Sequence, residues 1–195
     1  MRFTKVPENL FNEMQPNAGV LLNDFNPDEP GAAASIVSAI IGATTGGLNF
    51  NAAASYKDGG EGIDNCPKNM MELKEIENWE ITMSGTFVTV TAASAKSLVG
   101  AADVVEGKIT PRDHLVTEDF ADIWWVGDYS KKNGETKGGF MAIHMKHALN
   151  TAGFQLQTSD KEKGQFAFTY TAHYSIEEQT VVPFEIYIQE GSDEA

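Results

Sequence analysis

Two histidines three residues apart, His144 and His147, have the spacing in this sequence that most suggests metal chemistry. On a helix, that spacing would place both imidazoles on one face, where they could share a metal ion. The local pattern is that of a strand, however, and residues three apart on a strand point to opposite faces. No carboxylate or third histidine lies nearby in sequence. We therefore interpret the pair as structural and expect no metal site.

Other residues with chemical potential also lack the partners that chemistry needs. The single cysteine, Cys66, lies between Asn65 and Pro67, neither of which would activate a thiol, so we expect a buried or half-buried structural residue. The surrounding glycine- and acid-rich stretch 57–67 has carboxylates that could hold calcium. Their spacing does not match a calcium-binding loop with its closing bidentate glutamate, and we predict a solvated loop.

Catalytic signatures are missing from the sequence. It contains no Gly-x-Ser-x-Gly elbow, no phosphate-binding glycine loop and no dinucleotide-binding fingerprint. The adjacent carboxylates Glu118 and Asp119 are predicted to be solvated. A catalytic carboxylate pair assembled from distant positions stays open as an alternative. We expect no enzymatic activity and no cofactor.

Two adjacent tryptophans, Trp124 and Trp125, lie within a predicted strand and therefore point to opposite faces of it. One can pack in the core while the other contacts a neighbouring protein, because exposed aromatic residues are common at interfaces. An exposed indole could also stack on a sugar, which keeps a carbohydrate-binding module as an alternative.

The charge balance constrains the partners. The 195 residues include 28 Asp and Glu against 14 Lys and Arg, which gives a formal net charge of −14. Proteins that adhere to nucleic acid need a cationic surface, so adhesive DNA or RNA binding is disfavoured. No apolar run approaches the ~20 residues needed to cross a bilayer, and the N-terminus lacks the apolar core of a secretory signal. We expect a soluble protein made in a cytoplasm, with no membrane partner.

The elements that position these residues are mostly strands. Apolar and polar residues alternate with a period of two in several β-branched, Thr-rich segments, which is typical of half-buried strands. The predicted strands cover 20–25, 48–56, 81–90, 122–129, 139–145, 166–174 and 184–188, with further alternation at 154–157. A short helix is predicted at 91–100, capped by Thr91 and ended by Gly100. Residues 32–47 fit either a buried helix or a long loop.

Regular short strands with little helix predict a mainly β fold, a β-sandwich or barrel with one short flanking α-helix. The length fits one domain, and no linker or internal repeat divides residues 1–195. We expect an N-terminal arm at about 1–18 and long loops at about 27–47 and 127–139.

Several blocks, in order along nearly the whole chain, resemble the major tail (tail tube) proteins of long-tailed, siphovirus-type bacteriophages. None of the blocks is a catalytic signature, and the resemblance rests on their order. They are Pro7-Glu8-Asn9-Leu10-Phe11, Asn17-Ala18-Gly19-Val20-Leu21-Leu22, Ile41-Gly42-Ala43-Thr44-Thr45-Gly46-Gly47, Ile63-Asp64-Asn65-Cys66-Pro67-Lys68-Asn69-Met70, Met83-Ser84-Gly85-Thr86-Phe87-Val88-Thr89-Val90-Thr91, Asp122-Ile123-Trp124-Trp125-Val126-Gly127-Asp128-Tyr129 and the 166–174 strand.

This resemblance implies a structural virion protein that assembles into six-subunit rings. Strands from each subunit would join into an inner β-barrel, and the rings would stack into a tube through which genomic DNA passes. The implied partners are further copies of the chain and other tail proteins (tail initiator, tape measure and terminator), with DNA passing without adhesion. The implied location is the virion tail, after synthesis in the host bacterial cytoplasm.

Arms and long surface loops are free to reach a neighbouring subunit, and we expect the subunit contacts there. The candidate oligomer contacts are Phe3, Leu10, Phe11, Ile36, Ile40, Ile41, Trp124, Lys131 and Lys132. If acidic residues line the lumen, they would repel DNA phosphates. The main alternative is a non-catalytic carbohydrate- or protein-binding β-sandwich module of a virion.

Overall fold

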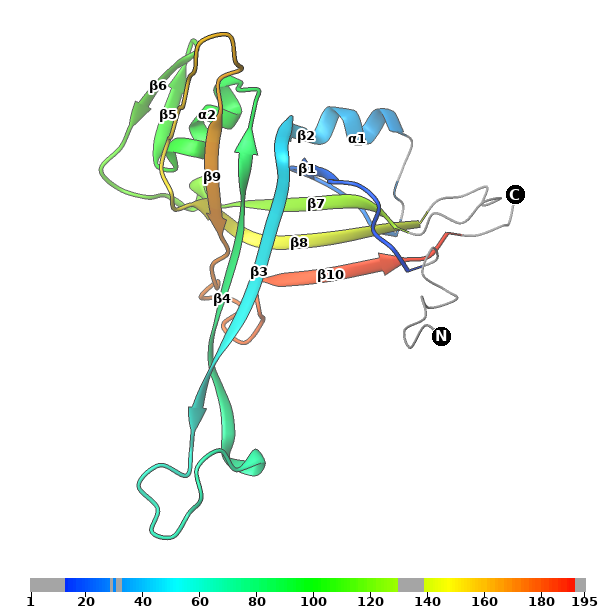
Figure 1. Ribbon diagram of the computed structural model, residues 1–195. Coiled ribbons are helices and arrows are strands. Elements are labelled where there is room, and N and C mark those ends of the chain that lie inside the picture. The colour runs from blue at the N-terminus through cyan, green and yellow to red at the C-terminus, as the bar shows by residue number, and fades with distance from the viewer. Residues whose placement is uncertain (1–12, 29, 31–32, 130–138, 192–195) are drawn as a thin grey trace.

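The computed structural model describes residues 13–28, 30, 33–129 and 139–191 (Figure 1). Its strands are β1 (Val20–Leu22), β2 (Ile40–Gly42), β3 (Thr44–Asp58), β4 (Lys74–Phe87), β5 (Ala102–Val105), β6 (Lys108–Pro111), β7 (Ala121–Tyr129), β8 (Gly139–Asn150), β9 (Phe166–Thr171) and β10 (Phe184–Gln189). Its helices are α1 (Ala33–Ala39) and α2 (Ala92–Val99), with 3-10 turns η1 (Met71–Leu73) and η2 (Thr117–Asp119). The predicted mainly β fold with a short flanking helix is confirmed.

Eight strands form one antiparallel sheet that folds into two layers at β8. Sheet A has the order β2-β1-β7-β8-β10, and sheet B has the order β8-β9-β4-β3. Strand β8 pairs with β10 up to Met145 and then, at Leu149 and Asn150, with β9. Between these two stretches His147 has a φ of 49°, which breaks the extended backbone. Such bends let one strand leave one sheet for another that crosses it, and in Figure 1 sheet B runs across sheet A.

The main core lies between the two sheets. Alternation puts one face of each strand inward, where large side chains from β4, β7, β8 and β9 meet and α2 closes one end. The buried members are Leu21, Ile81, Met83, Phe87, Leu98, Ile123, Ile143, Met145, Ala148, Phe166, Phe168, Tyr170 and Ala172. A smaller cluster on the opposite face of sheet A contains Leu22, Phe25, Trp124, Val126 and Ala142.

Helix α2 forms where the sequence predicts it and begins with a reciprocal cap. The Thr91 hydroxyl accepts a hydrogen bond from the Ser94 backbone N–H at 3.1 Å, and the Thr91 N–H donates to the Ser94 hydroxyl at 2.8 Å. Gly100 ends the helix with a φ of 85°. Ser97 hydrogen-bonds the hydroxyl of Tyr170 on β9 at 2.8 Å, which fixes the helix against sheet B.

Several predicted boundaries were wrong. Helix α1, strand β2 and the start of β3 lie inside the predicted long loop 27–47, so the helix alternative for 32–47 held in part. The alternation at 154–157 gives only an isolated bridge between Gln157 and Gln165. The β5–β6 hairpin was missed. In the predicted loop 127–139, β7 runs to Tyr129 and β8 begins at Gly139, while 130–138 lie outside the described residues.

The most prominent feature is a β3–β4 hairpin that extends far from the body of the molecule (Figure 1). We call residues 55–78 the arm, which is distinct from the N-terminal arm predicted at about 1–18. Its tip is ordered by Asp58, whose carboxylate accepts hydrogen bonds from the backbone N–H groups of Gly60 at 3.0 Å and Asn69 at 2.8 Å. These two donors hold the pKa of Asp58 below its usual value. The predicted loop at 57–67 is therefore the tip of a long ribbon.

Candidate assembly surfaces

The outer face of sheet B is polar and open. Residues on β3, β4 and β9 that point away from the core carry mostly hydroxyl and amide groups, and cross-strand neighbours match in type, such as Thr45 with Thr86 and Asn51 with Thr82. We call this the polar face. It comprises Thr45, Asn49, Asn51, Ala53 and Ser55 of β3, Asn78, Glu80, Thr82, Ser84 and Thr86 of β4, and Ala167, Thr169 and Thr171 of β9.

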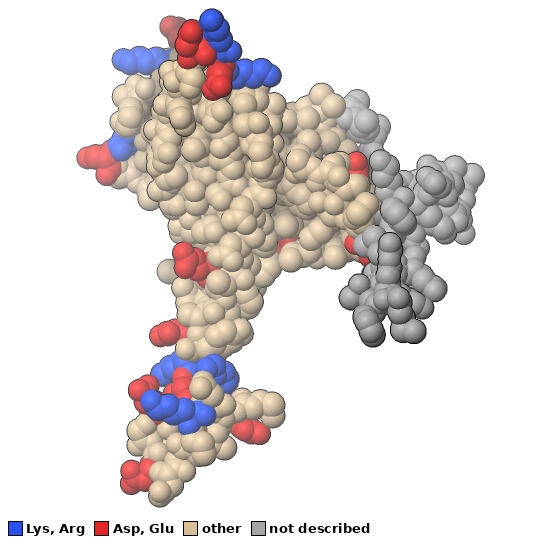
Figure 2. Space-filling model, in the orientation of Figure 1, with Lys and Arg blue, Asp and Glu red and all other residues tan. Residues whose placement is uncertain are grey.

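Charge is sparse on this face. Among the residues that define it, Glu80 is the one charged side chain and none is Lys or Arg; further along the same strands, on the arm, Lys57 is paired with Glu75. Figure 2 shows that charged side chains gather at the top of the molecule and on the arm, with a largely uncharged surface between them. A surface of small hydroxyls and amides remains hydrated and offers no cationic charge to displace counterions from phosphate.

Strand β3 is an open edge. It has 15 residues and pairs only with β4 among the described strands. A long edge strand leaves a row of backbone N–H and C=O groups that can pair with another chain. Within the described part of the chain, β2 and β10 are also edges of sheet A. One subunit therefore offers pairing edges on both of its sheets.

Five of the predicted oligomer contacts, Phe3, Leu10, Phe11, Lys131 and Lys132, lie outside the described residues. The other four lie on or beside sheet A. Ile40 on β2 is partly exposed, Ile41 packs against the main core, and Ile36 of α1 packs against the smaller cluster.

Trp124 is enclosed within the subunit, which corrects its expected role as an open contact residue. Its side chain is only 7% exposed. The indole stacks on the His144 ring with centroids 3.9 Å apart and contacts Phe25. Trp125 is half-buried, and its Nε1–H donates to the Ala18 carbonyl at 3.0 Å. The sugar-binding alternative therefore loses Trp124 as a stacking platform.

His144 and His147 both lie on β8, which extends past the predicted end at 145, and they act separately. His144 Nε2 lies 2.9 Å from Asp122 Oδ2, and Asp122 Oδ1 accepts a hydrogen bond from the His147 backbone N–H at 3.0 Å. Asp122, on the neighbouring strand β7, thus stabilises the bend of β8 through contacts with both histidines. His173 Nδ1 lies 3.1 Å from the His147 carbonyl oxygen, and His114 is exposed. Among the described residues, no group of three or more His, Cys, Asp or Glu side chains is arranged to hold a metal.

A short ion pair joins β8 to β10 in sheet A. Lys146 Nζ lies 2.6 Å from Glu185 Oε1, and the Tyr187 hydroxyl donates to the same carboxylate. These donors lower the pKa of Glu185, and the carboxylate raises the pKa of Lys146. The arrangement fixes an edge strand and resembles no proton-transfer site.

The prediction that Asp119 is solvated was wrong. Its side chain is fully buried, 2.5 Å from Arg112 Nη2, and also accepts a hydrogen bond from the Val116 N–H at 3.0 Å. Arg112 Nε lies 3.1 Å from Asp103 Oδ1, although its N–H is not aligned for a hydrogen bond there. The guanidinium thus ties β5–β6 to η2, a contact that the sequence alone does not indicate.

Cys66 is half-buried at the arm tip and is a free thiol, as the sequence predicts. Its Sγ lies 3.6 Å from Met70 Sδ, and it lines a small pocket with Asp58 and Lys68. Because the two sulfur atoms contact each other, Cys66 serves to pack the tip.

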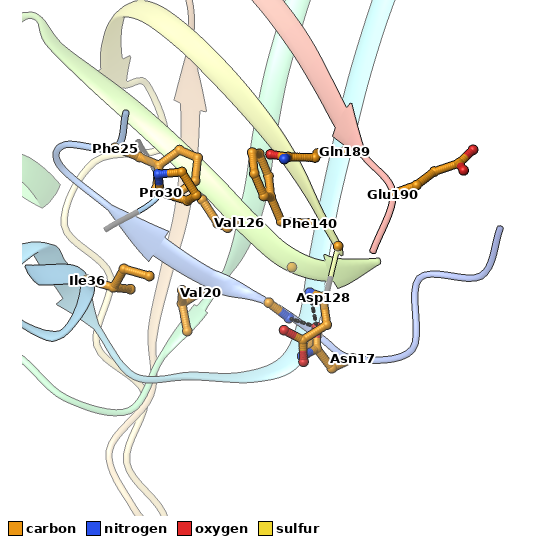
Figure 3. A pocket seen from close by; sticks show the side chains of 14 residues that line it. Asn17, Val20, Phe25, Pro30, Ile36, Val126, Asp128, Phe140, Gln189 and Glu190 are labelled. Atoms are coloured by element: carbon orange, nitrogen blue, oxygen red, sulfur yellow. Dashed lines mark hydrogen bonds between the residues drawn. The ribbon is translucent and has the colours of Figure 1, made fainter. Parts of the chain in front are cut away.

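A pocket of 680 Å³ opens beside the end of sheet A (Figure 3). Val20, Phe25 and Phe140 form much of its wall, and the Asp128 carboxylate is engaged by the Asn17 amide at 2.5 Å. Glu190 points away from the pocket in Figure 3. None of the described residues that line it is a histidine, cysteine, lysine or arginine. This set offers an apolar depression and no nucleophile with its base.

Comparison with protein-family models gives no match, and comparison with curated proteins gives no significant relative. Among the described residues, no helix is long and apolar enough to cross a membrane.

Proposed function

We propose that this chain is the major tail protein of a long-tailed bacteriophage, a non-catalytic subunit that builds stacked, six-membered rings into a tail tube. The observation that carries the proposal is the 15-residue open edge of β3 beside a polar, nearly uncharged sheet face. The choice of family rests on the ordered sequence blocks described above, which resemble those of major tail proteins.

Open edges favour a ring. An edge strand pairs with the edge of another copy, and repetition of one head-to-tail contact either closes a ring or grows a filament. Closure leaves no pairing edge exposed, which suits a subunit that presents edges on both sheets. Rings then stack through other surfaces, with the tail initiator, tape measure and terminator proteins as further partners in the virion tail.

The polar face is suited to the wall of the lumen. DNA adheres where lysine and arginine displace counterions from phosphate, and the polar face has neither. The wall proposed here is mostly neutral and hydroxylated, unlike the acidic lining considered from the net charge alone. Genomic DNA would slide along it through water.

Two matched lysine substitutions test the proposal. Ala53→Lys places a charge on the edge strand β3, opposite Glu80. We expect the new lysine to form a cross-strand ion pair with Glu80, which supports the fold of the variant. Ala167→Lys makes the same change on the same face but on β9, which lies between β4 and β8 in the order of sheet B. Ala167 itself is paired with Thr86 of β4, and β8 joins β9 further along, at Tyr170 and Thr171. We expect the wild type and Ala167→Lys to form large assemblies in light scattering and Ala53→Lys to remain small.

The second lysine also reports on the lumen. Assemblies of Ala167→Lys should retain labelled DNA at low salt, whereas wild-type assemblies should not. Equal assembly of both variants, or a wild type that never assembles with tail initiator proteins present, would contradict the proposal.

A further inference from the structure

Because the two sheets cross, each has an apolar face that continues past the region where they cover one another. In the covered region, Phe184 at the start of β10 contacts Phe50 and Trp79 of sheet B, with ring centroids 5.8 and 5.6 Å apart. From this junction both apolar faces run on into solvent, along the arm and along β10.

On the arm, the continuing face carries Tyr56 and Ile76. These residues are directly paired across β3 and β4, and they are 57% and 56% exposed. They follow Trp79 on the core side of the ribbon because a register shift at Ser55/Tyr56 moves the pairing by one residue. We call Tyr56 and Ile76 the arm strip.

On sheet A, the continuing face carries Ile186 and Ile188, which are 48% and 57% exposed. They share this face with Phe184, and Ile188 is paired with Met141 of β8. We call Ile186, Ile188 and Met141 the sheet A strip. In Figure 1 the arm and β10 leave the body in different directions, so one chain does not join its own two strips.

Both strips are unusual for a free subunit. A two-stranded ribbon is marginally stable in water without a hydrophobic partner. Among the described residues, the arm meets the body at its base, where Ile76 lines a pocket with Trp79, Tyr174 and Val182. Exposed isoleucines on an edge strand invite association. Inside the chain, aromatic and aliphatic side chains of the same two faces already pack against each other. Each strip therefore presents the same kind of side chain that the opposite sheet covers in the core.

We propose that the arm strip of one copy packs on the sheet A strip of a second copy, continuing between subunits the sheet-on-sheet contact that forms the core. This inference rests on the proposed function and names the surfaces of one of its contacts. The contact is heterologous, since two different patches meet, so each copy can engage a neighbour on either side.

Threonine substitutions remove the exposed tyrosine and isoleucine side chains of the two strips while keeping strand propensity. The arm variant is Tyr56→Thr/Ile76→Thr, and its matched control is Ser55→Thr/Asn78→Thr, the adjacent cross-strand pair on the opposite face. The sheet A variant is Ile186→Thr/Ile188→Thr. Circular dichroism and unfolding midpoints confirm that each full-length protein folds.

Pairwise affinity between immobilised and soluble variants identifies the contact. The sheet A variant keeps an intact arm and the arm variant keeps an intact sheet A strip, so this mixed pair retains one complete contact. Neither variant paired with itself retains any. We expect the mixed pair to bind at least about tenfold more tightly than either self-pair, and the control to bind itself like the wild type. Pairing of β3 edges contributes equally to all combinations.

Three results would overturn the inference. One is equal affinity in the mixed pair and the self-pairs, and another is wild-type affinity of the arm variant for itself. The third is wild-type assembly with loss only of binding to another tail protein, which would assign the strips to that protein. In each of these cases tubes could still form and the proposed function would stand. If the wild-type protein forms no tube, the proposed function is wrong. The affinity of the mixed pair still tests the contact between the two strips in that case.

Discussion

At the residue scale, Asn150 is the polar group on which the junction of β8, β9 and α2 depends. Its buried side-chain amide donates to the carbonyls of Leu98 at 2.6 Å and Gly153 at 3.0 Å. Its Oδ1 accepts from the Thr169 N–H at 2.9 Å. These three hydrogen bonds join β8 to α2, to the loop at Gly153 and to β9 through one side chain.

We expect Asn150→Leu to destabilise the protein by about 2–4 kcal/mol, because it leaves buried backbone groups without partners. Asn51→Leu, on the exposed polar face, should change stability by less than about 0.5 kcal/mol. Urea unfolding of both variants measures the difference, and similar midpoints would contradict this account of the junction.

The Glu185–Lys146 pair predicts how stability depends on pH. The pKa of Glu185 is lowered from 4.5 in the folded state, so its contribution is present above that value and is lost as the pH falls through the folded pKa. The pKa of Lys146 is raised from 10.5, so its contribution is present below that value and fades as the pH rises past the folded pKa.

Between about pH 5.5 and pH 3, we therefore expect the wild type to lose about 0.5–1 kcal/mol more stability than Glu185→Gln, a small amount because the pair is partly exposed. Urea midpoints across this range provide the measurement. Glu75→Gln, at an exposed position on the arm, is the control and should follow the wild type. If the Glu185→Gln and wild-type profiles are parallel, the Glu185–Lys146 pair does not contribute to the pH dependence of stability.

Some residue-scale features could be predicted because their causes are local. Thr91 and Gly100 mark the ends of α2 through hydrogen bonds within one turn, and the prediction is confirmed. The burial of Asp119 could not be predicted, since it depends on Arg112 and on how the β5–β6 hairpin folds back. Burial of Trp124 likewise depends on Phe25 and His144, which are distant in sequence.

At the element scale, the bend of β8 is what turns one sheet into two layers. His147 adopts a positive φ, which non-glycine residues rarely do and β-branched residues strongly avoid. Its backbone N–H is held by Asp122. We expect His147→Gly and His147→Asn to match the wild type in stability, and His147→Val to lose about 1–2 kcal/mol. Thermal unfolding of the three variants tests this, and a fully stable His147→Val would contradict it.

Elements with an unbroken period of two were predicted well, as β7 and β10 show. Strand β8 was predicted to end at 145, before its bend, but runs to Asn150. The arm was not predicted. Its strand β4 begins at Lys74, and the charged residues Glu75 and Glu77 flank Ile76 in an alternating pattern. The register shift beside Ser55 then leaves Ile76 and Trp79 three residues apart on one face. A bulge breaks the period of two on which sequence patterns rely, so the predicted strand began at 81 and missed the first residues of β4.

At the scale of the whole molecule, a formal charge of −14 per chain opposes assembly. Added salt screens this repulsion, because the Debye length falls from about 30 Å at 0.01 M to about 8 Å at 0.15 M. We expect the concentration needed for assembly to fall over this range, measured by light scattering. Assembly that weakens with salt would instead indicate that ion pairs between subunits dominate.

The tail-tube proposal is best tested by electron microscopy of the purified, concentrated wild-type protein in negative stain. We expect hollow tubes or stacked rings, formed by the chain alone or after addition of tail initiator proteins. A protein that stays monomeric under both conditions would contradict the tail-tube proposal and favour the binding-module alternative.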